Sequence, residues 1–171
     1  SNPAFPKGGS TRSTDSSRQA RRKVTEAPHY DDSLTIALLR ARDAVTAQFR
    51  DHVGEAGLTL QQWRVIRALA GGTALDTTTL ARRCVILAPS LSRIIRHLDD
   101  RGLVAPVPSK DRRQRVLKLT PEGEALFTEI WQVSEQKYAA IEAAFGEDEL
   151  HDLVVSLNRL RACLETGDGA A

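Results

Sequence analysis

The fold is decided by residues 77–119, which read TTTLARRCVILAPSLSRIIRHLDDRGLVAPVPSKDRRQRVLKL. Pro89 stands where proline favours the first turn of a helix, and Gly102 is the kind of residue that ends one. The alternating apolar residues after Gly102 are typical of half-buried strands. The stretch therefore predicts two helices and a hairpin, at residues 77–84, 90–101, 103–107 and 116–119. A short helix, a tight turn, a second helix and a basic hairpin, in this order, make a winged helix-turn-helix.

The sequence on both sides of this stretch predicts further helices. Upstream, apolar residues recur every three or four positions over residues 33–49, and Thr59-Leu60-Gln61-Gln62 has the form of a capping box at the start of a second helix. Downstream, Thr120 and Pro121 begin a long helix that Gly146 breaks. The last helix carries leucines at a spacing close to a heptad: Leu150, Leu153, Leu157, Leu160 and Leu164. The fold class we expect is mainly α with a small β wing.

The chain of 171 residues has the length of one domain, and its composition excludes several classes of protein. No run of about 18 apolar residues is present, which speaks against a membrane span. Residues 1–30 have few bulky apolar side chains and no secretory signal, so we expect a flexible tail and a cytoplasmic protein. No metal-ligand spacing, phosphate loop or nucleophile–base set is present, so we expect no enzyme, no cofactor and no metal site.

Charge is distributed unevenly along the chain, although the formal net charge is only +2. Residues 77–115 hold nine cations and three anions, whereas residues 119–171 hold three cations and eleven anions. Nearly all the basic groups of the first segment are arginines, whose planar guanidinium suits phosphates and guanine edges. We therefore expect one surface that binds a polyanion and a second, acidic and leucine-rich surface that does something else.

The second helix of the deciding stretch is the expected recognition helix. Its apolar side packs inward, and its polar side faces outward early in the helix, where side chains reach base edges in a major groove. The hairpin tip would carry arginines to a neighbouring minor groove. The alternative is a helical bundle whose surface hairpin binds nothing. The candidate DNA-binding residues are Pro89, Ser90, Ser92, Arg93, Arg96, Lys110, Arg112 and Arg113.

Over residues 33–164 the chain resembles the MarR family of transcriptional regulators. The resemblance rests on Leu80-Ala81, on LAPSL at 87–91, on LDDRGLV at 98–104 and on KDRRQRVLKLT at 110–120. It implies that Asp111 and Arg113 pair within the wing and leave Arg112 freer to meet DNA. The stretches SLTIALLRARD and QQWRVIRAL are similar, more narrowly, to regulators of homoprotocatechuate and related aromatic-acid operons.

The resemblance implies a homodimer whose interface is formed by the first helix and the last two helices. It implies a repressor that binds a near-palindromic operator and is released by a small aromatic or heteroaromatic carboxylic acid. The expected parts are a tail at 1–30, an N-terminal dimerisation helix at 31–57, the winged helix-turn-helix at 58–119, C-terminal dimerisation helices at 120–165 and a tail at 166–171.

An effector site between the dimer helices and the DNA-binding part is implied as well. Arg42 lies inside the apolar stripe of the first helix, where a charge is costly unless it is paired. It would either form a salt bridge across the dimer or seat a ligand carboxylate. Trp63 offers a flat apolar wall, although a lone tryptophan is more often part of a core. The candidate ligand-binding residues are Ser33, Arg42, Trp63, Arg64 and Arg67.

Two other interpretations stay open on the sequence. Cys84 and Cys163 are expected to be reduced thiols, yet Cys84 could make the protein a redox-responsive regulator of the same type. A dimeric interaction protein that no longer binds DNA would keep the fold, but it should have lost the basic residues that this chain retains. His29 and His52 lie near helix ends, and both are expected at the surface.

Overall fold

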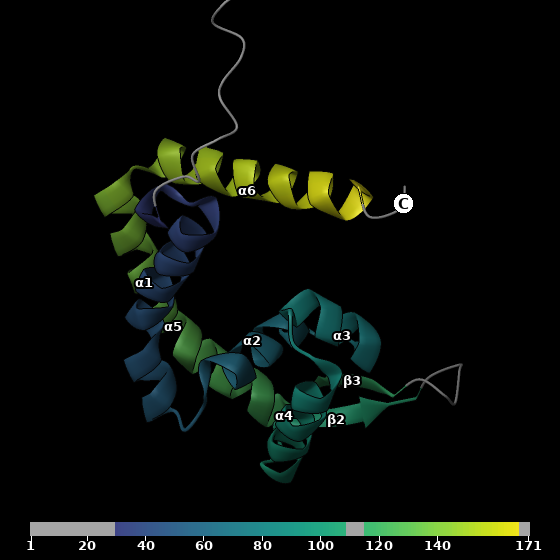
Figure 1. The fold of residues 1–171 in the computed structure, drawn as a ribbon. Coiled ribbons are helices and arrows are strands. Elements are labelled where there is room, and N and C mark those ends of the chain that lie inside the picture. The colour runs from purple at the N-terminus through teal and green to yellow at the C-terminus, as the bar shows by residue number, and fades with distance from the viewer. Residues whose placement is uncertain (1–29, 109–114, 168–171) are drawn as a thin grey trace, which may run out of the picture. The chain divides into compact units, whose positions relative to one another are not determined.

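The structure of the chain is a computed structural model that describes residues 30–108 and 115–167 (Figure 1). Contacts divide the chain into two units, one up to Arg40 and one from Ala41 onward. In chain order the elements are η1 (Tyr30–Asp32), α1 (Leu34–Glu55), α2 (Leu60–Leu69), β1 (Leu75–Asp76), α3 (Thr77–Cys84), α4 (Ala88–Asp100), β2 (Val104–Val107), β3 (Val116–Leu119), α5 (Pro121–Phe145) and α6 (Glu147–Gly167). The predicted fold class, mainly α with a small β wing, is confirmed.

Side-chain hydrogen bonds fix two of the helix starts that the sequence indicated. Thr59 accepts a hydrogen bond from the Gln62 N–H at 3.2 Å, and the Gln62 side chain accepts one from the Thr59 N–H at 2.8 Å. The capping box predicted for α2 is therefore confirmed. Thr120 caps α5 in a similar way, by accepting from the Gly123 N–H at 3.0 Å, and Pro121 follows in the first turn.

Helix α4 begins at Ala88 and ends at Asp100, slightly earlier at both ends than predicted. Pro89 lies in its first turn, as expected. The chain leaves the helix through Gly102, whose φ of +69° lies in the left-handed region that glycine adopts without strain. The Gly102 N–H bonds back to the Asp99 carbonyl at 2.8 Å, which closes the last turn.

The wing is a hairpin of β2 and β3, paired antiparallel from Val104 opposite Leu119 to Val107 opposite Val116. Strand β3 also pairs with β1, so the sheet has three strands in the order β1-β3-β2. The sequence did not predict β1, because two residues are too few to show alternation. Residues 109–114 at the hairpin tip lie outside the described residues, and so do the candidates Lys110, Arg112 and Arg113 and the expected Asp111–Arg113 pair.

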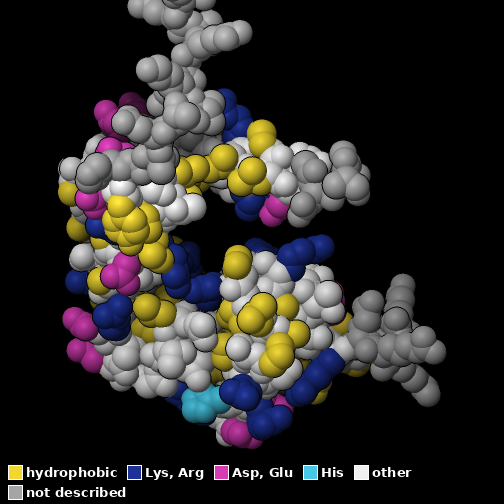
Figure 2. Space-filling model, viewed as in Figure 1, with side chains coloured by type: hydrophobic (Ala, Val, Ile, Leu, Met, Phe, Trp, Pro, Cys, Tyr) yellow, Lys and Arg dark blue, Asp and Glu magenta, His cyan; other side chains and the backbone are white. Residues whose placement is uncertain are grey.

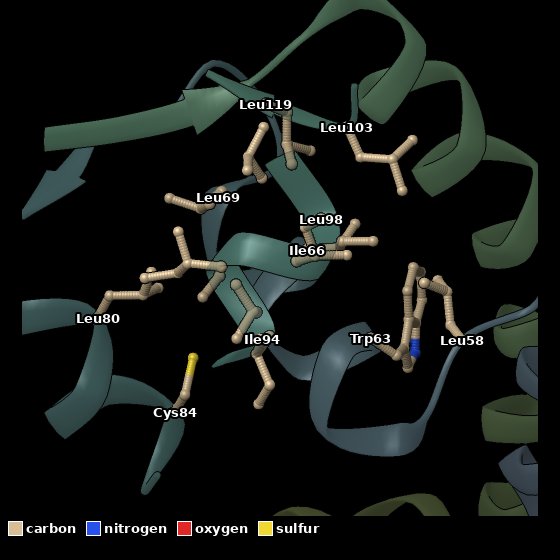
Figure 3. Packing of buried hydrophobic residues seen from close by; sticks show 14 of the residues in the cluster. Leu58, Trp63, Ile66, Leu69, Leu80, Cys84, Ile94, Leu98, Leu103 and Leu119 are labelled. Carbon is tan, nitrogen blue, oxygen red and sulfur yellow. The ribbon is translucent and has the colours of Figure 1, made fainter. Parts of the chain in front are cut away.

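One hydrophobic core joins α2, α3 and α4 to the wing strands (Figure 3). Burying one such leucine or isoleucine side chain stabilises a fold by about 1.5–3 kcal/mol, so this core holds α4 firmly with its polar side outward. Phe49 and Val53 of α1 and Ile130 of α5 extend it. The residues labelled in Figure 3 are Leu58, Trp63, Ile66, Leu69, Leu80, Cys84, Ile94, Leu98, Leu103 and Leu119.

The first turn of α5 is tied to the DNA-binding part in two ways. A Cβ on Gly123 would lie 2.1 Å from the Leu103 carbonyl oxygen, so only glycine lets the helix approach this closely. The Glu124 carboxylate accepts hydrogen bonds from the N–H groups of Gly71 and Gly72, at 3.2 and 3.0 Å. The loop between α2 and β1 is therefore held by α5.

Much of the predicted apolar stripe of α1 and the leucine series of α6 stays exposed in the single chain. Of α1, only Phe49 and Val53 are buried, and none of the α6 side chains that the structure describes is buried. Figure 2 shows hydrophobic side chains along the part of the view that α6 occupies in Figure 1. These two helices present apolar surface that residues 30–108 and 115–167 of the chain do not cover.

Candidate nucleic-acid interface and ligand pocket

Helix α4 has a buried and an exposed side. Leu91, Ile94, Ile95 and Leu98 are buried, and the exposed residues include the candidates Pro89, Ser90, Ser92, Arg93 and Arg96. Figure 2 shows dark blue side chains in the region of α3 and α4. Within the described residues, neither Arg93 nor Arg96 makes a hydrogen bond or an ion pair. Both guanidinium groups are therefore available to a polyanion.

Two other arginines of the basic segment are engaged within the fold. Arg101 donates from Nη1 to the Gly57 carbonyl at 2.8 Å and from Nη2 to the Ala56 carbonyl at 3.3 Å. Arg115 pairs with Asp99 at 3.1 Å in an exposed salt bridge, which contributes about 0–1 kcal/mol. The sequence counted both as part of the basic surface, because spacing alone does not separate structural from available arginines.

The turn between α3 and α4 exposes two apolar side chains. Val85 is 84% exposed and Leu87 is 80% exposed, whereas Ile86 between them is buried. Val85 has a φ of +52°, and among the described residues it is the one non-glycine residue in the left-handed region. This conformation lets the Val85 and Ile86 N–H groups bond back to the carbonyls of Arg82 and Ala81, at 3.2 and 3.0 Å.

A hollow of about 120 Å³ opens among α1, α2 and α5. A larger and more open hollow of about 460 Å³ shares Arg67 and Tyr138 with it. The first is lined by Val45, Thr46, Phe49, Leu60, Trp63, Arg64, Arg67 and Tyr138. The second is lined by Arg67, Trp131, Glu135, Tyr138, Ala139 and Glu142.

Arg67 is the cation that lines both hollows. Its Nη1 donates to the Tyr138 hydroxyl at 2.8 Å. Its guanidinium carbon lies 5.2 Å from the ring centroid of Trp131 and 5.5 Å from that of Tyr138, within cation–π range. Among the residues that the structure describes, no carboxylate pairs with it. A guanidinium has five N–H donors, so this one is oriented and keeps donors free for an anion.

Arg64 and Trp63 also line the first hollow, but both serve the fold as well. Arg64 donates from Nη1 to the Cys84 carbonyl at 2.8 Å, which ties α2 to the end of α3. Trp63 is only 4% exposed and stacks on Phe127 at 5.6 Å between ring centroids. The tryptophan therefore belongs to the core, the alternative that its residue type favoured, while one part of it faces the hollow.

The other two ligand candidates are placed differently. Arg42 lies one turn before Val45 and Thr46 on α1, is exposed, and is not among the residues lining either hollow. Leu38 and Val45 on either side of it are themselves 37% and 42% exposed in the single chain, so the choice between a salt bridge across a dimer and a carboxylate seat stays a prediction. Ser33 lies in the unit that ends at Arg40, where its hydroxyl is 2.8 Å from that of Thr35.

His52 is half-buried, so its expected place at the surface is wrong. Its Nε2 lies 2.9 Å from the Oγ of Ser134, a fully buried residue of α5. The Ser134 hydroxyl donates to the Ile130 carbonyl at 3.0 Å, so its oxygen accepts from His52 and Nε2 carries the proton. Nδ1 of His52 is buried without a partner within the described residues. Burial, and next the Lys137 ammonium, lower the pKa of His52.

The structure does not support redox sensing at Cys84. The residue is fully buried, and its thiol points at the Arg64 carbonyl at 3.6 Å. Burial raises the pKa of the Cys84 thiol, which disfavours the thiolate that oxidants attack. Cys163, on α6, is exposed.

Neither a metal site nor a membrane-spanning helix is found in the described part of the chain. No group of three or more His, Cys, Asp or Glu side chains is placed there to hold a metal ion. None of the helices in residues 30–108 and 115–167 combines the length and the apolar character that crossing a membrane requires.

The sequence did not predict all the residues that line the two hollows. Phe49, Trp131 and Tyr138 were not among the candidates, and the structure brings them together around Arg67. A usable signal was present, because Trp131 and Tyr138 stand seven positions apart and therefore share one side of a helix. Nothing in the sequence told which arginine of α2 they would face.

Comparisons with known proteins agree with this architecture. Residues 56–115 match the model of the MarR family. The HTH-type transcriptional regulator FarR of Neisseria gonorrhoeae is 41% identical over 146 residues, which cover 83% of this chain and 99% of that protein. The homoprotocatechuate degradative operon repressor of Escherichia coli is 42% identical over 123 residues, which cover 71% of this chain and 83% of that protein.

Solved structures are similar over most of their length. NadR in complex with 4-hydroxyphenylacetate has a TM-score of 0.71 at 42% identity, covering 80% of this chain and 96% of the NadR chain. The transcriptional repressor CouR, bound to a 23-mer DNA duplex, has a TM-score of 0.69 at 26% identity, covering 80% of this chain and 99% of the CouR chain. These relatives are transcriptional regulators, and the sequence-based expectation that the chain is not an enzyme agrees with them.

Proposed function

The chain belongs to the MarR family of transcriptional regulators, and from this premise we propose that it is a homodimeric repressor that a small aromatic carboxylic acid releases from a near-palindromic operator. The proposal has three parts, which rest on different regions of the molecule. They are the contact between α4 and DNA, the dimer formed by the long helices, and the pocket around Arg67.

The recognition helix supplies the DNA contact. The positive end of the α4 dipole and the guanidinium groups of Arg93 and Arg96, which have no partner within the described residues, favour an anionic partner on its exposed side. In the major groove, Ser90, Ser92 and both arginines would lie within reach of base edges. Lys110, Arg112 and Arg113 of the wing are proposed to contact the neighbouring minor groove.

The exposed apolar side chains of α1 and α6 support a second copy of this chain as their partner. Leu34 and Leu39 of α1 are 57% and 55% exposed, and Leu153 and Val155 of α6 are 43% and 51% exposed. Contiguous exposed apolar surface on a soluble chain marks an interaction site. A two-fold dimer would place two recognition helices about 34 Å apart, one turn of DNA. Residues 31–57 and 120–165 are the proposed dimerisation segments.

The single observation that supports an aromatic carboxylate as the ligand is the position of Arg67. A guanidinium without a carboxylate partner in the described residues stands among Trp63, Trp131 and Tyr138. Such a site suits a flat ring that bears a carboxylate, because the aromatic walls cover the ring and the guanidinium fork binds the acid group. NadR was solved with 4-hydroxyphenylacetate, and the Escherichia coli relative is named for homoprotocatechuate degradation, so the proposed effector is an acid of this class.

Release follows if the ligand prefers one arrangement of the helices. The pocket is lined by α1 and α5, which belong to the proposed dimer part, and by α2, which supports the DNA-binding part. A ligand that fits better when the recognition helices are wrongly spaced lowers the operator affinity by linkage. Couplings of this kind are about 1–3 kcal/mol, or roughly 5–150-fold. The operator must then weaken ligand binding by the same factor.

The first prediction tests this site through the response to a ligand. Operator DNA from the gene's own upstream region would be titrated with 4-hydroxyphenylacetate, and with the uncharged 4-hydroxyphenylacetamide as a control. Fluorescence anisotropy would report DNA affinity. Arg67→Gln should keep DNA affinity but require about 10- to 150-fold more acid for release, because a charge-assisted hydrogen bond contributes about 1.5–3 kcal/mol. The uncharged amide should release the wild-type protein from DNA only weakly.

Arg42→Ala, measured beside Arg67→Gln, separates the two candidate carboxylate seats. If Arg42 seats the acid, this variant loses the response and keeps its melting temperature. If Arg42 forms a salt bridge across the dimer, melting temperature and DNA affinity fall with or without ligand. Arg50→Gln removes an exposed arginine of α1 and should change neither property. An Arg67→Gln protein that is released at the wild-type concentration of acid would overturn the proposed pocket.

A further inference from the structure

Val85 is an unusual residue for the conformation that it adopts. A β-branched side chain at φ +52° is strained, and glycine or asparagine would adopt that backbone far more readily. Burial of the Val85 side chain does not offset this strain, because the side chain is 84% exposed. The preference of valine for negative φ is therefore not met just before the recognition helix, and no contact within the described fold compensates for the strain.

Leu87 breaks a second local preference two residues later. It is the N-cap of α4, a position where serine, threonine, aspartate or asparagine would satisfy a free N–H. Leucine makes no side-chain cap there, and it is 80% exposed. Because Ile86 is buried between them, Val85 and Leu87 form an outward-facing apolar pair at the start of α4.

The charges around this pair restrict what can cover it. Residues 77–98 contain four arginines and no acidic residue. Arg82 and Arg83 are exposed at the end of α3, and Arg93 and Arg96 are exposed on α4. Apolar side chains within a surface of this charge suit a polyanion that also offers apolar groups. Duplex DNA does so in its major groove, where each thymine presents a 5-methyl group.

We propose that Val85 and Leu87 contact thymine 5-methyl groups in the operator and so contribute to its sequence specificity. The inference rests on the proposed DNA-binding role and adds a pair of base-reading residues to it. Arg93 and Arg96 would bind the hydrogen-bonding edges of bases, while Val85 and Leu87 would contact thymine methyl groups a short distance along the same groove.

The test removes the methyl group and nothing else. Duplexes that bind the wild-type protein would first be selected from a random pool, and each thymine would then be replaced by deoxyuridine in turn. Loss of one buried methyl weakens binding about fourfold, so symmetric replacement in both half-sites should weaken it about 15-fold. The penalty should appear at one or two thymines in each half-site.

Two variants link that penalty to the apolar pair. Val85→Asn suits the left-handed backbone, and Leu87→Ser supplies the missing cap, so the melting temperature should stay the same or rise. Both variants should nevertheless bind the thymine duplex more weakly, and each should lose the uracil penalty at the thymine that its own side chain contacts. Leu87→Met is the matched control, because it keeps an apolar side chain and should keep the penalty.

The outcomes separate this inference from the proposed function. If no duplex is enriched from the pool, the DNA-binding proposal itself fails. If duplexes are enriched but uracil costs nothing, or costs the same in Val85→Asn and Leu87→Ser as in wild type, the methyl contact is wrong. In that case the pair is free to serve another macromolecule, such as an acidic protein.

Discussion

His52 joins α1 to α5 through one hydrogen bond whose direction its neighbours set. The Ser134 hydroxyl donates its hydrogen bond to the Ile130 carbonyl, so the imidazole of His52 must donate from Nε2. A second proton would have to sit on Nδ1, which is buried and has no acceptor within the described residues. The charged form of the ring is therefore disfavoured in the folded chain.

The second prediction concerns the effect of pH on stability. Burial, then the Lys137 ammonium, lower the pKa of His52 below its ordinary value of 6.5, although Asp51 and Glu55 on the same helix act in the opposite direction. Near that pH the unfolded chain binds more protons than the folded one, so the free energy of unfolding falls as the pH falls. Urea unfolding from about pH 7 to about pH 5, at fixed protein concentration, should show a smaller loss for His52→Gln than for wild type.

The control for this prediction is His151→Gln, which changes an exposed histidine of α6. It should lose stability with falling pH as the wild type does. If His52→Gln loses as much stability as His151→Gln, the half-buried imidazole does not titrate as its surroundings indicate.

For single residues, the sequence indicated which residue types matter, but it did not predict how buried each side chain is or what it contacts. Arg67 was one of five residues predicted to bind a ligand, and the structure places it in the lining of both hollows. Arg42 was singled out as a charge within an apolar stripe, and the residues of that stripe on either side of it are exposed in the single chain. The difference arises because burial depends on partners far away in sequence or on another chain.

Helix starts are the elements whose ends local chemistry determines most directly. The Thr59–Gln62 capping box satisfies N–H groups that the first turn of α2 leaves free. Helix α2 carries Trp63, Arg64 and Arg67, so its start determines where the side chains of the pocket lie.

The third prediction is that Thr59→Ala lowers the free energy of unfolding by about 1 kcal/mol, the usual cost of losing a threonine cap. Thr59→Ser should restore most of it. Thr128→Ala serves as the control, because this exposed threonine bonds only to the Glu124 carbonyl of its own helix. Chemical denaturation of the three variants measures the differences. Equal losses for Thr59→Ala and Thr128→Ala would mean that the capping box contributes nothing specific.

Helices whose ends carry a capping residue, a first-turn proline or a terminating glycine could be predicted, and elements without such residues could not. Thr59, Thr120, Pro121 and Gly102 mark ends that the structure confirms. Strand β1 exists only because β3 offers it a partner, and Asp76, which caps α3 by accepting from the Thr78 and Thr79 N–H groups, was not recognised as a cap. Such features depend on pairing and on backbone geometry that a residue pattern does not encode.

For the whole molecule, the fourth prediction concerns assembly. A charge at Leu153 would lie in the proposed interface of α6, and an unpaired buried charge costs about 3–5 kcal/mol. Leu153→Glu should therefore form monomers that bind operator DNA weakly. Light scattering and a DNA-shift assay check both properties. Ala162→Glu adds the same charge on the opposite side of α6 and should remain dimeric. A dimeric Leu153→Glu protein would move the interface elsewhere.

The helices and the two hairpin strands of the DNA-binding part that the structure describes could be predicted, because residues 77–119 are contiguous and strongly patterned, whereas β1 could not. The pocket could not, because its walls come from three helices that lie up to 93 positions apart, from Val45 to Tyr138. Which faces of these helices meet is determined by core packing, and a single sequence contains that information only indirectly.

The hydrogen bonds that the Gly71 and Gly72 N–H groups donate to Glu124 join the first turn of α5 to the loop between α2 and β1, so α5 can act as a lever. Tyr138, at the pocket, and Glu124, at the far end, are separated by about 21 Å along the helix axis. A tilt of about 5° around Tyr138 would swing the Glu124 end sideways by about 2 Å, comparable to the helix shifts that separate two states of other regulators. The loop that Glu124 holds leads directly into β1 and α3. A small angular change beside a ring bound at the proposed pocket would thus become a displacement large enough to move the recognition helix out of register with the groove.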